Sequence, residues 1–92
     1  MIVSFKHKGL ETLYQTDSAK GVQPDHAAKL RRILSVLDVA QTPADANLPG
    51  YHLHQLKANQ QGRWSVRVNG NWRVTFAFTG TDVELLDYED YH

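Results

Sequence analysis

The sequence ends in EDYH, residues 89–92, a group whose side chains can hold and transfer protons. Histidine exchanges a proton near neutral pH, and a neighbouring carboxylate such as that of Asp90 can orient the imidazole or raise its pKa. Tyr91 adds a flat ring that can stack on a nucleobase and a hydroxyl that can form hydrogen bonds. Chain ends fray unless something holds them, so such a group needs an ordered element beside it.

The segment YHLHQLK, residues 51–57, supplies further groups of this kind. In an extended chain His52 and His54 lie on one side, and Lys57 follows close behind. With the arginines farther along, these residues provide acids, bases and cations but no nucleophile. That set suits RNA cleavage by the substrate's own 2′-hydroxyl, which needs a base, an acid and positive charge on the phosphorane. Positioned acid–base groups each contribute about 10²- to 10⁴-fold to such a reaction.

Metal binding is the alternative interpretation of the histidines, because His52, His54 and His92 include a His-x-His pair. Such a short pair is a weak signal, since alternate residues of a strand often simply face solvent. The sequence has no cysteine, which excludes disulfides, thiolate catalysis and cysteine-bound zinc. We therefore expect no metal and no other cofactor.

A predicted antiparallel sheet must position these groups. Its strands are three segments rich in β-branched and aromatic residues and bounded by turn signals, residues 63–68, 71–78 and 82–88. Their apolar residues share one face only if a three-residue loop, 69–71, joins the first two strands. This loop pairs Val66 with Val74 and Val68 with Trp72. The last strand then holds the end of the chain to the sheet.

The same register places Arg67 directly across from Arg73 on the other, open face. Like charges in this position lower stability by a few tenths of a kcal/mol to about 1 kcal/mol, so the pair favours binding of an anion. The alternative is that each arginine meets an acid of the tail or points into water. No acidic residue lies between Asp45 and Asp82, so a basic region is hidden within a formal net charge of zero.

The N-terminal half predicts a short strand, MIVSF, and two helices. Leu10, Leu13 and Tyr14 recur at helical spacing in the first helix. Residues 21–40 form the second, with Pro24 in its first turn and an apolar stripe at Leu30, Ile33, Leu34 and Leu37. We expect an α+β fold in which two N-terminal helices pack on an antiparallel sheet, as one domain over residues 1–92.

Three cations of the second helix, Lys29, Arg31 and Arg32, lie outside the apolar stripe. Residues of this kind usually form a solvated face, although a polyanionic partner could also use them. The composition, 41% hydrophobic and 22% charged, is that of a globular protein without an apolar run long enough to cross a bilayer. The N-terminus lacks the apolar region of a secretory signal, so we expect a soluble cytoplasmic protein without membrane contact.

Three stretches together resemble a known family: LPGYHLHQLK, GRWSVRVNGNWRVTFAF and the terminal DYH. They are similar to the HigB branch of the RelE superfamily of toxins, small endoribonucleases that cut messenger RNA in the ribosomal A site. The resemblance runs from SFKHKGLE to the last residue. It implies a microbial RNase-like fold whose open sheet face receives the message. It also implies a HigA-like helix-turn-helix antitoxin, contacts with the ribosome and its RNA, and operator DNA reached only through the antitoxin complex.

The resemblance also implies roles for individual residues. His92 is the leading proton-transfer group, Arg73 stabilises the phosphate, Lys57 is a phosphate contact or base, and Tyr91 is a stacking platform. The other positions that match the family's active site are His54 and Asp90, with Asn71 at the rim. Arg67 belongs to the family string as an RNA contact. Ala58 departs from the pattern, because relatives often have a glycine there.

Two alternatives keep the fold but change the function. The first is a non-catalytic module that binds RNA or protein. The second is a free-standing ribonuclease, which is disfavoured because a small sheet offers few aromatic platforms to hold RNA by itself.

Overall fold

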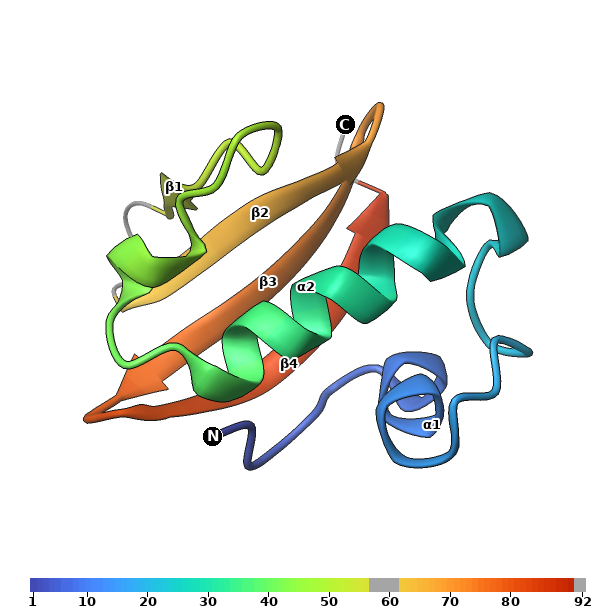
Figure 1. The fold of residues 1–92 in the computed structure, drawn as a ribbon, viewed down its shortest axis with the longest axis horizontal. Coiled ribbons are helices and arrows are strands. Elements are labelled where there is room, and N and C mark those ends of the chain that lie inside the picture. The colour runs from blue at the N-terminus through green and yellow to red at the C-terminus, as the bar shows by residue number, and fades with distance from the viewer. Residues whose placement is uncertain (57–61, 91–92) are drawn as a thin grey trace.

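The computed structural model of the chain describes residues 1–56 and 62–90, so Lys57, Tyr91 and His92 lie outside the described residues. The described part contains two α-helices, two short 3₁₀ helices and a four-stranded antiparallel sheet in the order β1-β2-β3-β4 (Figure 1). The predicted α+β arrangement is confirmed. The elements are α1 (Lys8–Thr16), η1 (Pro24–His26), α2 (Ala27–Val39), η2 (Pro43–Ala46), β1 (His54–Gln55), β2 (Arg63–Asn69), β3 (Trp72–Thr79) and β4 (Asp82–Asp90).

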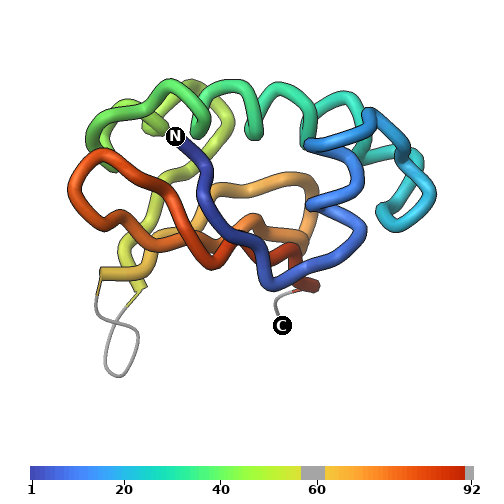
Figure 2. The backbone as a smooth tube through the Cα atoms, turned by 90° about the horizontal axis from the view of Figure 1, so that it is seen from below, coloured from blue at the N-terminus to red at the C-terminus, as the bar shows by residue number. Residues whose placement is uncertain are grey.

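Both α-helices lie on one side of the sheet, as the view along its edge shows (Figure 2). α1 begins where the Nδ1 atom of His7 accepts a hydrogen bond from the Leu10 N–H at 3.1 Å, and it buries Leu10 and Leu13. α2 buries the whole predicted stripe against the sheet. The strands contribute the other half of this core, with Val66, Val74, Phe76, Val83 and Leu86 all fully buried.

The β2–β3 register confirms the two pairings that matter for the site, Val66 with Val74 and Arg67 with Arg73. The predicted pairing of Val68 with Trp72 is wrong, because Asn69 joins the ladder opposite Trp72. The extra residue sits in the strand as a bulge at Val68 instead of in the loop, which shortens to Gly70 and Asn71. Either placement of the extra residue keeps the apolar rows on one face, and the bulge leaves Val68 buried.

The expected first strand is only partly present. Residues near the N-terminus run parallel to β4 and pair with it at two isolated bridges, Ile2 with Val83 and Phe5 with Leu86. β4 carries an irregularity at this point, and Leu85 has a φ of 58°. Val83 and Leu86 are three positions apart and both buried, which strict alternation would not allow. The irregularity that buries both residues also interrupts the ladder with the N-terminal segment.

Trp72 links the start of β3 to the helices. Its ring stacks on Tyr88 with centroids 4.6 Å apart, and its edge meets His26 at 5.6 Å. His26 Nδ1 and the Tyr88 hydroxyl form a buried hydrogen bond of 2.6 Å. Burial raises the pKa of Tyr88, so the hydroxyl stays protonated at neutral pH.

We expect Trp72→Ala to lower the free energy of unfolding by about 3 kcal/mol, near the bottom of the range for buried tryptophans because the ring is half-buried. Thermal melting measures the loss. Trp72→Phe keeps a stacking ring and should lose less than half as much. An alanine variant that melts with the wild type would show that the stack contributes no stability.

Candidate nucleic-acid site

A cavity of about 510 Å³ opens on the sheet face that points away from the helices, at the β1 edge. Val66 and Val74 face the helices, so the residues that alternate with them, among them Ser65 and Arg73, face the other way. Among the described residues, those that line it are His52, Leu53, His54, Leu56, Ser65 and Arg73. The structure thus brings a predicted proton-transfer residue, His54, and a predicted phosphate contact, Arg73, to one hollow.

Two rows of cross-strand partners build this face. The first row runs from His54 through Ser65 to Thr75, and the second from Arg67 through Arg73 to Glu89. Partners across an antiparallel ladder point to the same side of the sheet. The rows therefore place an imidazole beside two guanidinium groups on strands that the ladder holds rigidly in register.

His52 reaches the cavity for a reason that the sequence did not give. Its φ is 49°, so the chain is not extended there and simple alternation with His54 does not apply. The preceding residue fixes this turn, because the buried Tyr51 accepts a hydrogen bond through its carbonyl oxygen from the Arg67 N–H at 2.6 Å. The bond attaches the segment to the edge of β2, and both histidines line the cavity.

The guanidinium of Arg73 is held at the β2–β3 turn. Its Nη1 donates to the carbonyl oxygens of Gly70 at 3.2 Å and Trp72 at 3.3 Å. Neither carbonyl oxygen carries a charge. Glu89 is the cross-strand partner of Arg73, but its carboxylate accepts from Thr75, and the structure shows no ion pair between Arg73 and any acid of residues 1–56 and 62–90. A positive charge that is anchored but not neutralised suits a phosphate ligand.

A partly buried hydrogen-bond chain beside Arg73 was missed by sequence reasoning. Arg63 Nη2 donates to the Thr75 hydroxyl at 3.0 Å, and this hydroxyl donates to the Glu89 carboxylate at 3.2 Å. Thr75 is only 1% exposed, although it lies on the face that we expected to be open. Extending the predicted register by one strand would have found Glu89 opposite Arg73.

Of the remaining predicted site residues, the structure describes Asp90 and Asn71. Asp90 is the partner of Trp72, whose ring packs against the core, so its register position is on the helix side of the sheet and not beside Arg73. Asn71 is exposed in the β2–β3 turn, at the same end of β3 as Arg73. Lys57, Tyr91 and His92 fall outside the described residues, and their roles stay predictions.

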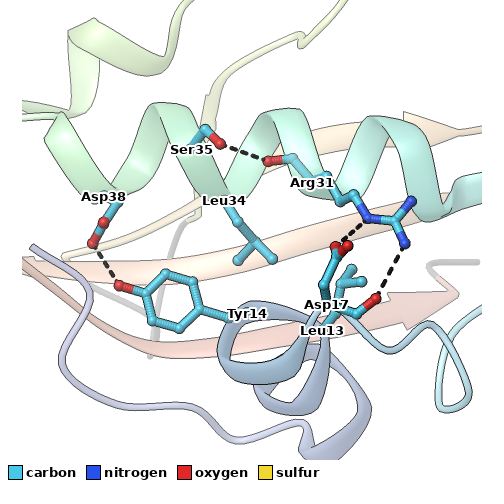
Figure 3. A pocket seen from close by; sticks show the side chains of 7 residues that line it. All are labelled: Leu13, Tyr14, Asp17, Arg31, Leu34, Ser35 and Asp38. Atoms are coloured by element: carbon cyan, nitrogen blue, oxygen red, sulfur yellow. Dashed lines mark hydrogen bonds and ion pairs between the residues drawn. The ribbon is translucent and has the colours of Figure 1, made fainter.

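A second cavity, of about 310 Å³, lies between α1 and α2 (Figure 3). Its polar groups are already bonded to each other: the Tyr14 hydroxyl donates to Asp38 at 2.8 Å, and Arg31 Nε forms an ion pair with Asp17 at 2.6 Å. The Asp38 carboxylate also accepts the Ile2 N–H at 3.1 Å. These contacts hold the two helices and the N-terminal segment together. The polar groups that line this cavity therefore have a structural role.

No group of three or more histidine, cysteine or acidic side chains within residues 1–56 and 62–90 is arranged to hold a metal ion. Among the helices described, none is both long and apolar enough to span a bilayer.

Comparison with known proteins agrees with the resemblance. The family model described as "RelE-like toxin of type II toxin-antitoxin system HigB" matches residues 3–92. The chain is 41% identical over 92 residues to the endoribonuclease HigB of Proteus vulgaris, covering 100% of both chains. It is 35% identical over 94 residues to the toxin HigB-1 of Vibrio cholerae serotype O1, covering 100% of this chain and 98% of that protein. The chain therefore belongs to the HigB-like family, the RelE-like toxins of type II toxin–antitoxin systems.

Proposed function

We propose that this toxin is an endoribonuclease that cleaves messenger RNA in the ribosomal A site and so inhibits translation. The observation that carries the proposal is the cavity that His54 and Arg73 share on the sheet face away from the helices. The name of the Proteus vulgaris relative, an endoribonuclease, supports the same reaction. An imidazole and a guanidinium in one cavity are groups that acid–base cleavage of a phosphodiester would use.

The reaction needs no nucleophile from the protein. A base takes the proton of the substrate's 2′-hydroxyl, the 2′-oxygen bonds to the adjacent phosphorus, and the bond from phosphorus to the 5′-oxygen of the next nucleotide breaks. An acid then protonates that departing oxygen, which leaves a 2′,3′-cyclic phosphate and a 5′-hydroxyl. Arg73 stabilises the negative charge of the phosphorane, since a donor aimed at a developing charge is worth about 10²- to 10³-fold.

The proposed proton carriers come from two segments of the sequence, residues 51–57 and residues 89–92. We assign the leading role to His92, with His54 and Lys57 as the second acid–base candidates. Asp90 has its register position on the helix side of the sheet, so we propose that it acts only on the imidazole of His92 and not on that of His54. Tyr91 stacks on a base of the message. Arg67 and Asn71 contact the RNA beside the scissile phosphate.

Membership in the family implies an antitoxin partner. We propose that this partner is a HigA-like helix-turn-helix protein, and that the toxin meets operator DNA only indirectly, as part of the complex with its antitoxin. The toxin acts in the cytoplasm, where the other proposed partners, ribosomes and messenger RNA, are found.

We expect cleavage to depend on the ribosome, because RNA affinity rises with the number of phosphates neutralised and the site itself offers few cations. Purified protein should degrade a message that is being translated in a reconstituted system and leave the same message intact without ribosomes. Equal cleavage of both at one enzyme concentration would contradict ribosome dependence. Cleavage of neither, by soluble folded protein, would contradict the nuclease itself.

A further inference from the structure

Two cations of α2, Lys29 and Arg32, lie beside one buried residue, Tyr51, and the backbone of Arg67 is bonded to the same residue. The Nζ of Lys29 lies 5.4 Å from the centre of the Tyr51 ring and donates to the Gly50 carbonyl oxygen at 3.1 Å. The N–H of Arg67 donates to the Tyr51 carbonyl oxygen at 2.6 Å. Arg32 and Tyr51 line the same groove beside α2. The turn at residues 50–52 thus joins the cations of α2 to those of the sheet.

These cations are not neutralised within the described part of the chain. The one ion pair between described residues joins Arg31 to Asp17, on the α1 side of α2 (Figure 3). Lys29, Arg32 and Arg67 have no such partner among residues 1–56 and 62–90. Partial burial lowers the pKa of Lys29, and the nearby charges of Arg67 and then Arg32 lower it further. Arg67 and Arg32 therefore each repel the ammonium group of Lys29 in the free protein.

The cluster is continuous with the cleavage site. Arg67 is the direct cross-strand partner of Arg73, which lines the cavity with His54. A path of positive charge therefore leads from the cavity over the β2 edge of the sheet to the exposed Arg32 on α2. Repulsion along such a path is relieved only by a ligand that carries negative charge at several successive points.

We propose that Lys29, Arg32 and Arg67, here called the edge strip, bind the phosphate backbone of RNA on the ribosome. The proposal rests on the proposed function, since it supplies the RNA contacts that the cavity lacks. Phosphate contacts of this kind fix position and register without reading sequence. The edge strip therefore sets how the toxin sits on the ribosome, while the cavity performs the cleavage.

An acidic polypeptide is the competing occupant. The groove beside Arg32 has a volume of about 450 Å³, and its apolar lining includes Val36, Leu48 and Tyr51. RNA is favoured because the charge continues past this groove to Arg67 and Arg73. An acidic peptide seated in the groove would compensate Arg32 and leave the sheet arginines repelling each other.

The test compares two charge-matched double variants. Lys29→Gln/Arg32→Gln removes two charges from the strip, and Lys6→Gln/Lys8→Gln removes two exposed charges that precede or begin α1, beside the β4 edge. Binding is measured by sedimentation with ribosomes over a range of salt concentrations, and cleavage of translated message is measured in parallel. The strip variant should bind about tenfold more weakly and lower the slope of log affinity against log salt by about two, with kcat unchanged. The control should match the wild type.

Several results separate the possibilities. A strip variant that binds with the affinity and salt slope of the control overturns the proposal. So does a strip variant that binds and cuts normally but escapes neutralisation by the antitoxin, which would assign the surface to the acidic peptide. Wild-type protein that cuts nothing yet binds ribosomes through the strip would refute the proposed nuclease and leave the strip standing. Repeating the binding on ribosomes without message distinguishes ribosomal RNA from messenger RNA as the source of the phosphates.

Discussion

Deletion of His92 is expected to reduce cleavage of translated message by at least about 10²-fold and to leave the melting temperature nearly unchanged. A positioned acid or base contributes about 10²- to 10⁴-fold, so loss of the leading proton carrier should remove most of the activity. The loss of one polar side chain removes little apolar burial, so the melting temperature should stay near that of the wild type. The variant would then lose cleavage activity while keeping the stability of the wild type.

His92→Gln is the matched variant, because it removes the imidazole and leaves the length of the chain unchanged. Both changes should lower kcat by similar factors if the imidazole is what matters. A deletion that impairs cleavage while His92→Gln does not would assign the effect to the shortened chain and not to the imidazole. If neither change slows cleavage and both proteins melt normally, the proton carrier lies elsewhere, and His54 is the next residue to replace.

Replacing Arg73 by alanine is expected to lower kcat by about 10²- to 10³-fold, the usual effect of removing a charge-stabilising donor from a transition state. The free energy of unfolding should change little or rise slightly. Among the described residues, the guanidinium donates to two carbonyl oxygens of the β2–β3 hairpin and to no acid, and its removal ends the repulsion with Arg67. Cleavage on ribosomes and thermal melting measure the two effects.

Arg73→Lys tests whether the fork geometry or the charge alone matters, and we expect an activity between those of alanine and wild type. Arg31→Ala is the control, because its exposed ion pair with Asp17 lies away from the cavity and contributes at most about 1 kcal/mol. Wild-type kcat in the Arg73→Ala variant would contradict its role at the phosphate. A large loss of stability would instead make Arg73 a structural residue.

The sequence predicted the parts of the site that depend on alternation. The pairing of Arg67 with Arg73 followed from requiring the apolar rows of β2 and β3 to share a face, and burial of Val66 and Val74 enforces that requirement physically. The sequence could not place the extra residue of the hairpin, because a longer loop and a bulge preserve the same parity. The pairing of Val68 was wrong for that reason.

Other features depend on contacts between distant segments, and periodicity does not report these. The hydrogen bond from Arg67 to Tyr51 bends the chain at His52 and joins the cations of α2 to the sheet. Thr75 is buried within the Arg63–Thr75–Glu89 hydrogen-bond chain, although strand alternation predicts that it faces solvent. Asp90 shows a further limit. Its place in the sequence, two residues before His92, suggested a position in the site, but its register position is on the face of the sheet opposite Arg73.

The chemical identity of the fragment ends tests the central claim most directly. A translated message is cut by the purified toxin, and the new termini are identified by mass spectrometry. Attack by the substrate's 2′-hydroxyl predicts a 2′,3′-cyclic phosphate, or the 3′-phosphate formed from it, on one fragment and a 5′-hydroxyl on the other. A message with a 2′-deoxy nucleotide at the cut position should survive. A 3′-hydroxyl paired with a 5′-phosphate would show that water attacks the phosphate, and would contradict the proposed mechanism.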